Sequence, residues 1–350
     1  MELLNKTLEL KGSDIFIVPG SPAKAKVNGK LISLTEERLG VADTQKLIED
    51  TYALAAHRDP KLLAADGDDD FSFSMERISR FRCNAYRQRG SLAATYRVVA
   101  FGLPDPKTLG IPELVMRQAD MLSGMILVTG PAGSGKSTTL ACMVDRINSS
   151  RSGHIITIED PIEYLHPHKQ SLVSQREIPN DASTFQRALR AALRQAPDVI
   201  MLGEMRDHET MQTAITAAET GHLLLSSLHT VGAAKTVDRI VDAFPPNQQQ
   251  QVRIQLSMVL RAVISQRLVP CVGGGQVSVF EVMTITPAVQ NMIRDGRTHQ
   301  IDNVIFGGTA NQSMLSMDNE LLRMVREGRV SKENAILYAS NPELVCKRLQ

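Results

Sequence analysis

One short stretch of the sequence carries residue types at a spacing that suits phosphate binding. Residues 130–137, GPAGSGKS, fit the pattern GxxxxGK[ST]. Glycines allow backbone N–H groups to wrap around phosphate oxygens, and the N-terminus of a following helix favours negative charge. Lys136 should reach the β- and γ-phosphates, and the Ser137 hydroxyl should bind Mg²⁺. The sequence therefore predicts a site for ATP with Mg²⁺, contacted by Gly130, Pro131, Ala132, Gly133, Ser134, Gly135, Lys136, Ser137 and Thr138.

Carboxylates follow two apolar segments that are predicted to be strands. After VIMLG (199–203), Gly203 stands where a Walker B strand usually carries its acid, and the acid comes one residue later, at Glu204. A second set lies in the loop after HIITI (154–158), where Pro161 prevents a helix: Glu159, Asp160 and Glu163. Ligands bind where the carboxyl ends of parallel strands meet. One acid could orient Mg²⁺ through its waters while another polarises the attacking water, and the residues alone leave the assignment open.

Two histidines flank an apolar segment, GHLLLSSLHT at 221–230. Its centre is predicted to be a buried strand, and an unpaired buried histidine is costly. His229, at the carboxyl end, should lie near the γ-phosphate and act as a sensor of hydrolysis. His222 is roughly 20 Å away along the strand. It is expected to be either a structural histidine or a relay to a domain or subunit interface.

Arginines are concentrated in two further places. One cluster falls on two predicted strands near the N-terminus: Arg80, Arg82, Arg87, Arg89 and Arg97. The other lies on one face of a helix predicted over 184–195: Arg187, Arg190 and Arg194. A nucleic-acid-binding face is disfavoured, because the net charge is +1, tryptophan is absent and no RNP1 pattern occurs. The second cluster could serve a subunit interface or intramolecular ion pairs.

The elements that must position these residues fall on either side of a Pro- and Gly-rich linker, predicted at 102–112. Before it, residues 1–101 are expected to form short strands and a helix from Thr44 to Ala56, with a hairpin turn at Asn28-Gly29. The acidic run 66–70, DGDDD, lacks the spacing of a calcium loop and is expected to be a solvated turn.

After the linker, strands alternate with helices, which predicts an α/β fold with a parallel sheet. The strands are expected at 125–129, 154–158, 199–203 and 222–228, and the helices at 136–150, 184–195 and 208–220. Residues 246–269 are predicted to form one long helix, followed by a strand at 277–283 and C-terminal helices. The N-terminus lacks a signal-peptide pattern, and no apolar run reaches the ~18 residues needed to span a bilayer.

Several of these segments occur together, in order and at close spacing: GPAGSGKSTT, ITIEDPIEY, LRQAPDVIMLGEMRD, TAAETGHLLLSSLHT and AAKTVDRIVDAFP. From about residue 12 to 340 the chain resembles the secretion and type IV pilus hexameric ATPase superfamily, in particular its PilT-like, twitching-motility branch. The resemblance implies a RecA-like P-loop core at 113–350 and a smaller α+β, PAS-like N-terminal domain at 1–101.

The resemblance also implies roles for single residues. Glu163 would be the catalytic base and Glu204 the acid linked to Mg²⁺, with Ser137 as the other metal-side group. Arg82 and Arg97 would reach over the nucleotide and neutralise charge at the γ-phosphate, as arginine fingers do. Arg190 and Arg194 match the ALRxxLR pattern of the family.

The function implied is that of a hexameric motor ATPase that retracts type IV pili. It would be cytoplasmic and held at the inner face of the cytoplasmic membrane by an inner-membrane pilus platform protein. Residues 288–295, AVQNMIRD, are similar to the AIRNLIRE segment of retraction members, with Gln290 and Asp295 as departures. Two alternatives stay open: a PilT-like ATPase of a type IV secretion or conjugation system, and a DNA translocase.

Overall fold

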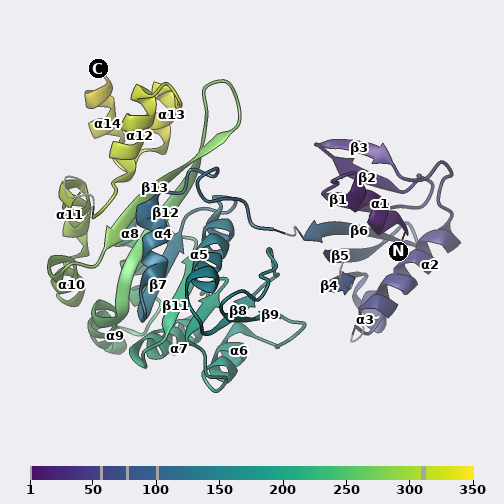
Figure 1. Ribbon diagram of the computed structural model, residues 1–350, viewed down its shortest axis with the longest axis horizontal. Coiled ribbons are helices and arrows are strands. Elements are labelled where there is room, and N and C mark those ends of the chain that lie inside the picture. Colours follow the sequence, from purple (N-terminus) through teal and green to yellow (C-terminus); the bar gives the residue numbers. More distant parts are fainter. Residues whose placement is uncertain (1, 56–57, 76–78, 100–101, 309–312) are drawn as a thin grey trace. The chain divides into compact units, whose positions relative to one another are not determined.

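The computed structural model describes residues 2–55, 58–75, 79–99, 102–308 and 313–350 (Figure 1). The chain divides into two compact units. The first is residues 1–102 together with 163–165, and the second is residues 103–162 with 166–350. No helix in the described ranges is both long and apolar enough to cross a membrane.

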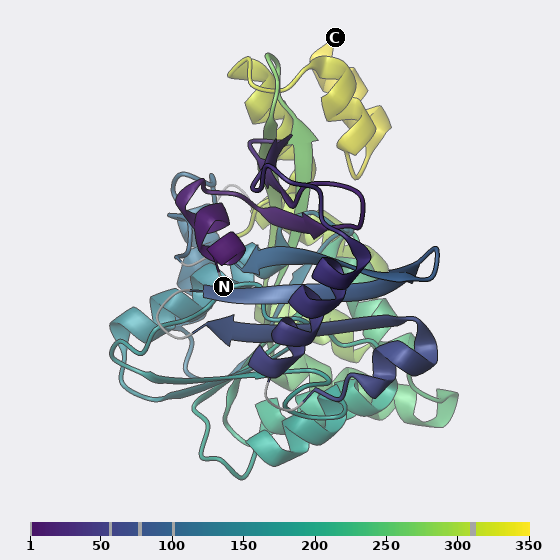
Figure 2. The same cartoon turned by 90° about the vertical axis from the view of Figure 1, so that its right-hand side faces the viewer.

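The N-terminal unit is built on an antiparallel sheet of order β3-β2-β1-β6-β5-β4. Asn28 and Gly29 have φ of 48° and 79°, so β2 and β3 meet in the expected tight hairpin turn. Helix α2 lies across one face of the sheet, mainly against β6 (Figure 2). Its residues Ile48 and Tyr52 are buried in the core of this unit. The strands are β1 (Asp14–Ile17), β2 (Lys24–Val27), β3 (Lys30–Ser33), β4 (Asp68–Met75), β5 (Ser79–Gln88) and β6 (Ser91–Val99), and the helices are α1 (Glu2–Glu9), α2 (Val41–Leu54) and α3 (Lys61–Asp66).

The sequence suggested that the acidic run at 66–70 is a solvated turn, and this prediction is wrong. The run ends α3 at Gly67 and begins β4 at Asp68. Asp69 is 4% exposed, because its carboxylate accepts a hydrogen bond from the Tyr52 hydroxyl at 2.7 Å and pairs with Arg58. The prediction failed because the inward alternation of β4 starts at a charged residue whose partners are distant in sequence.

The second unit contains a sheet of order β13-β12-β7-β11-β10-β8-β9, parallel except for the edge strand β13. This confirms the predicted α/β fold with a parallel sheet. Strands β7, β10 and β11 are buried along their whole length, which explains why their residues are mostly apolar. The strands are β7 (Gly124–Thr129), β8 (His154–Glu159), β9 (Leu172–Glu177), β10 (Val199–Leu202), β11 (Leu223–Leu228), β12 (Leu260–Pro270) and β13 (Gln276–Thr284).

Helices cover both faces of this sheet. Helix α5 packs on one face, and helices α6 to α9 pack on the other. Helices α12 to α14 gather at the far end of the β12–β13 hairpin (Figure 1). The helices are α4 (Glu113–Arg117), α5 (Lys136–Ser150), α6 (Phe185–Ala192), α7 (His208–Glu219), α8 (Ala233–Asp242), α9 (Pro246–Val259), α10 (Pro287–Arg294), α11 (Ile301–Gly308), α12 (Met317–Arg326), α13 (Lys332–Tyr338) and α14 (Pro342–Leu349), with short 3-10 turns at Gln118–Asp120 and Thr298–Gln300.

The long helix predicted over 246–269 is wrong in its second half. Helix α9 ends at Val259, and residues from Leu260 on form β12, which pairs with β7 and β13. The apolar residues of α9 and β12 follow one another without a Gly or Pro between them, so no local signal marks the change. Pairing with two strands supplies what the local sequence does not, and it places Ser265 and Gln266 beside the strand that leads into residues 130–137.

Candidate nucleotide site

The P-loop connects β7 to α5 through glycines in conformations that other residues rarely adopt. Gly130, Gly133 and Gly135 have φ of 149°, 73° and 88°. A Cβ on Gly130 would lie 2.2 Å from the Gln266 carbonyl oxygen, so only glycine fits there. Gly135 is the N-cap of α5 and has no side chain to cap the helix. A helix N-terminus without a side-chain cap is a favourable place for an anion.

The side chains of the loop also suit a phosphate group. Ser134 is buried and its hydroxyl has no hydrogen-bond partner among the described residues, which leaves a donor for a ligand oxygen. Lys136 is buried, with 7% of the residue exposed. Its ammonium donates hydrogen bonds to the carbonyl oxygens of Gly130 and Pro131, at 3.1 and 2.9 Å. The ammonium is thus held against the loop, where phosphate oxygens would replace these carbonyl oxygens as its partners. These residues fit ATP, with Lys136 and the loop amides as its phosphate ligands.

A line of polar side chains runs from Lys136 across the carboxyl ends of β11 and β10. The Lys136 Nζ lies 3.5 Å from Nδ1 of His229, and Nε2 of His229 lies 3.3 Å from Glu204. The other carboxylate oxygen of Glu204 pairs with Arg206 at 2.5 Å. This line exists because β7, β11 and β10 are parallel neighbours, so their following residues share one edge. The sequence-predicted Lys136, His229 and Glu204 therefore lie together.

Arg206 is a site residue that the sequence reasoning missed. Its pKa is raised, first by its hydrogen bond to Glu204 and further by the charges of Glu204 and Asp160. The guanidinium thus interacts electrostatically with Glu204, which follows β10, and with Asp160, which follows β8. Because Arg206 follows Glu204 by only two residues, its place at the same strand end could have been predicted from the sequence.

The acids of the β8 loop have different surroundings. Glu159 is 8% exposed, and its Oε1 accepts hydrogen bonds from the Thr157 hydroxyl and the Gln175 amide, at 2.6 and 3.2 Å. Its contacts therefore include polar groups of β8 and β9. Asp160 is exposed at the sheet edge. Glu163 is exposed and is grouped with the N-terminal unit, so its part as the catalytic base stays a prediction.

A magnesium ion would find few ready-made ligands among the described residues, which hold no group of three or more His, Cys, Asp or Glu side chains suited to a metal. Mg²⁺ in phosphate sites keeps several waters and uses one or two carboxylates plus phosphate oxygens. The exposed Ser137 and the carboxylate of Glu204 fit that pattern. A dedicated protein cage is not needed.

Arg82 and Arg97 face each other across β5 and β6 in the N-terminal unit. Each is paired with an aspartate: Arg82 with Asp70 at 2.5 Å and Arg97 with Asp14 at 2.9 Å. They line a polar hollow of about 280 Å³. The structure therefore brings the two predicted arginines to one place and supplies each with an acid that the sequence gave no reason to expect.

The remaining candidates lie away from the P-loop. His222 precedes β11, at the strand end opposite His229, and its Nδ1 lies 3.0 Å from the Ala217 carbonyl oxygen. Arg190 is exposed on α6, whereas Arg194 lies beyond the end of that helix and donates to the Arg190 carbonyl oxygen at 3.1 Å. The helix predicted to reach residue 195 stops at Ala192, so the two arginines do not form one regular helical row.

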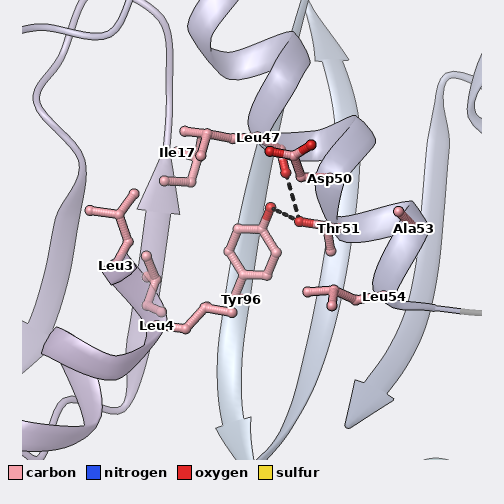
Figure 3. Close-up of a pocket in the computed structure, with 10 residues that line it drawn as sticks. Leu3, Leu4, Ile17, Leu47, Asp50, Thr51, Ala53, Leu54 and Tyr96 are labelled. Atoms are coloured by element: carbon pink, nitrogen blue, oxygen red, sulfur yellow. Dashed lines mark hydrogen bonds between the residues drawn. The ribbon is translucent and has the colours of Figure 1, made fainter. Parts of the chain in front are cut away.

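A separate cavity of about 280 Å³ lies in the N-terminal unit between α1, α2 and the sheet (Figure 3). Among the described residues that line it, the polar side chains are Asp50 and the hydroxyl pair of Thr51 and Tyr96, whose oxygens are 2.9 Å apart. Burial raises the pKa of Tyr96, so its hydroxyl stays neutral. Because the described lining residues include no Lys, Arg or His, this cavity does not suit a nucleotide. The other lining residues are Leu3, Leu4, Ile15, Ile17, Leu47, Ala53 and Leu54.

The chain is similar to known proteins along most of its length. Residues 105–341 match the family described as type II/IV secretion system protein. The chain is 42% identical over 342 residues to the type IV pilus retraction ATPase PilT of Pseudomonas aeruginosa, covering 98% of both chains. It is 47% identical over 275 residues to a twitching motility protein of Neisseria gonorrhoeae, covering 78% of this chain and 73% of that one.

A solved structure is similar as well. The crystal structure of the pilus retraction motor PilT with bound ADP has a TM-score of 0.90 and 44% sequence identity, and the match covers 99% of this chain and 98% of that one.

Proposed function

This chain belongs to the type II/IV secretion system protein family, and we propose that it is the ATPase that retracts type IV pili in its host. The observation that carries the proposal is near full-length similarity to pilus retraction ATPases, at 42% identity over 98% of the chain. The intact line from Lys136 through His229 to Glu204 supports it, because a scaffold that only bound nucleotide would not need the last two groups.

The described residues divide the work of ATP hydrolysis. The loop amides and Ser134 would hold the phosphates, and Lys136 would exchange its loop carbonyls for the β- and γ-phosphates. Glu204 and Ser137 would hold Mg²⁺, which neutralises charge on the β- and γ-oxygens when bound. His229 lies between Lys136 and Glu204, so a change at the γ-phosphate would reach both. Glu163 would act as the base toward the attacking water.

The assembly we propose is a homo-hexamer in which each site is completed by a neighbour. Arg82 and Arg97 of the N-terminal domain would leave Asp70 and Asp14 and reach the γ-phosphate of an adjacent subunit. Hydrolysis would then swing one domain against the other about the linker at 102–112. Arg190 and Arg194 are exposed and available for contacts between subunits, and His222 could transmit the position of β11 to such a contact.

The partner we propose is an inner-membrane pilus platform protein, which would hold this cytoplasmic ATPase at the inner face of the membrane. The segment 288–295, which covers α10 from its second residue to the C-cap Asp295, is our candidate for that contact. A DNA translocase is disfavoured by the net charge of +1 and the scarcity of aromatic side chains for base stacking. The relatives named above favour retraction over a secretion or conjugation role.

Deletion of the gene in its native host tests this function. Loss of surface motility together with an excess of pili that do not retract is expected, and wild-type protein should restore both. Normal piliation with lost conjugation or effector delivery would contradict retraction and support a secretion system. Unchanged piliation and motility would contradict any role in pilus dynamics.

A further inference from the structure

A buried glutamine, Gln266, lies directly behind the P-loop. It is 3% exposed and belongs to β12, which runs parallel to β7, the strand that leads into the loop. Its neighbour Ser265 shares a hydrogen bond of 2.8 Å with Thr129, the last residue of β7. Strand β12 therefore lies against the point where β7 turns into the loop.

Gln266 contacts the loop region through three different groups. Its side-chain oxygen accepts a hydrogen bond of 2.7 Å from the Thr139 hydroxyl, in the first turn of α5. Its side-chain nitrogen lies where a Cβ on Gly135 would approach to 2.8 Å. Its main-chain oxygen closes off the corresponding space at Gly130. One residue thus contacts the start of the loop, its end, and the helix that follows.

This arrangement bears on how the loop keeps its shape. Phosphate binding needs the loop amides to converge, yet glycines lose more backbone entropy on ordering than other residues. Contacts at both ends restrict that freedom, and a buried hydrogen bond is costly to lose when one partner stays behind. A rigid support on the buried side of the loop therefore favours the binding conformation before ATP arrives.

We propose that Gln266 is a positioning residue that holds the P-loop in its phosphate-binding conformation, and so sets the affinity for nucleotide phosphates. The proposal rests on the ATP site proposed above. It assigns to β12 a part in nucleotide binding that the P-loop motif does not contain.

Variants of the full-length protein test the proposal by their affinity for ATP and ADP, with KM and kcat measured in parallel. Gln266→Leu should weaken ATP binding and raise KM about 10-fold, with kcat changed less than about threefold. Thr139→Val should act in the same direction. In the double variant both partners of this hydrogen bond are apolar, so neither is left unsatisfied. It should therefore bind ATP at least as tightly as the single variant with the lower affinity.

Gln266→Glu gives a second, isosteric test. It keeps an oxygen for Thr139 but adds negative charge beside the loop, so ATP affinity should fall more than in Gln266→Leu, and more for ATP than for ADP. Gln251→Glu, an exposed residue of α9, makes the same change of charge away from the loop and should bind ATP like wild type. Thermal unfolding and hexamer formation check that each variant folds.

ATP affinities of Gln266→Leu and Gln266→Glu within twofold of wild type would overturn the proposal. So would additive losses in the double variant, or a fall in kcat with KM unchanged. Failure of the wild-type protein to bind ATP, or full binding by Lys136→Ala, would instead contradict the ATP site itself.

Discussion

Replacing Glu281 by glutamine is expected to stabilise the protein at alkaline pH and to leave its stability at acid pH nearly unchanged. Glu281 is 6% exposed on β13, and its carboxylate accepts a hydrogen bond of 2.9 Å from the Ala233 amide, at the start of α8. Burial raises its pKa from an ordinary 4.5 to about 7, and the negative charges of Asp302 and Asp318 add to the effect.

The sign follows from proton binding. Between pH 4.5 and about 7 the folded protein holds a proton on Glu281 that the unfolded chain has already lost. The free energy of unfolding therefore falls as pH rises through this interval, and the loss is complete above it. At about 1.4 kcal/mol for each pH unit, the interval corresponds to ~3 kcal/mol. Glutamine keeps an oxygen for the Ala233 amide but carries no charge, so the variant escapes this loss.

Urea unfolding of wild type and Glu281→Gln at pH 5 and pH 8 measures the effect. We expect the two proteins to differ by less than ~1 kcal/mol at pH 5, and the variant to be more stable by ~2–3 kcal/mol at pH 8. Glu219→Gln, an exposed carboxylate of α7, is the matched control and should follow wild type at both values. A wild-type pH dependence that persists in Glu281→Gln would refute the reasoning.

Three further predictions concern the nucleotide site. Gly130→Ala should reduce ATP affinity by ~100-fold or more, because its Cβ would clash with a main-chain oxygen. At Gly133 a Cβ has no atom within 4 Å, so Gly133→Ala should lose only ~10-fold in affinity, from backbone strain. Titration with a fluorescent ATP analogue compares the two variants, and equal losses would contradict the clash. Arg206→Gln should lower the Mg²⁺ concentration for half-maximal turnover at least ~threefold, because a cation no longer competes for Glu204; an unchanged or higher requirement would speak against it. Arg82→Ala should lower kcat by ~1000-fold while ATP still binds, and normal hydrolysis by a hexamer of this variant would exclude the arginine-finger role.

Local sequence patterns were enough to predict that Lys136, His229 and Glu204 lie at the same edge of the sheet. The P-loop, Glu204 and His229 each follow a short, wholly buried strand that is mostly apolar, and parallel strands must bring such residues to one edge. The neighbour relations β7–β11 and β11–β10 then place Lys136, His229 and Glu204 in line. No long-range information was needed beyond the assumption of a parallel sheet.

What the sequence could not provide depends on partners far away along the chain. Arg97 pairs with Asp14 across 83 residues, and Thr139 bonds Gln266 across 127. No periodic pattern announces such contacts. Gln266 was also hidden by the missed change from α9 to β12, since a residue assigned to a helix cannot be placed beside a strand of the sheet. The short strand β9 was missed because only its residues Val173 and Glu177 are buried, so its sequence lacks a strand pattern.

The central claim is that ATP turnover at the P-loop drives pilus retraction, and fluorescently labelled pili in living cells of the native host test it most directly. Cells whose only copy carries Lys136→Ala should extend pili but show almost no retraction events, while cells restored with wild type retract them. Retraction at the wild-type frequency in the Lys136→Ala cells would contradict the account.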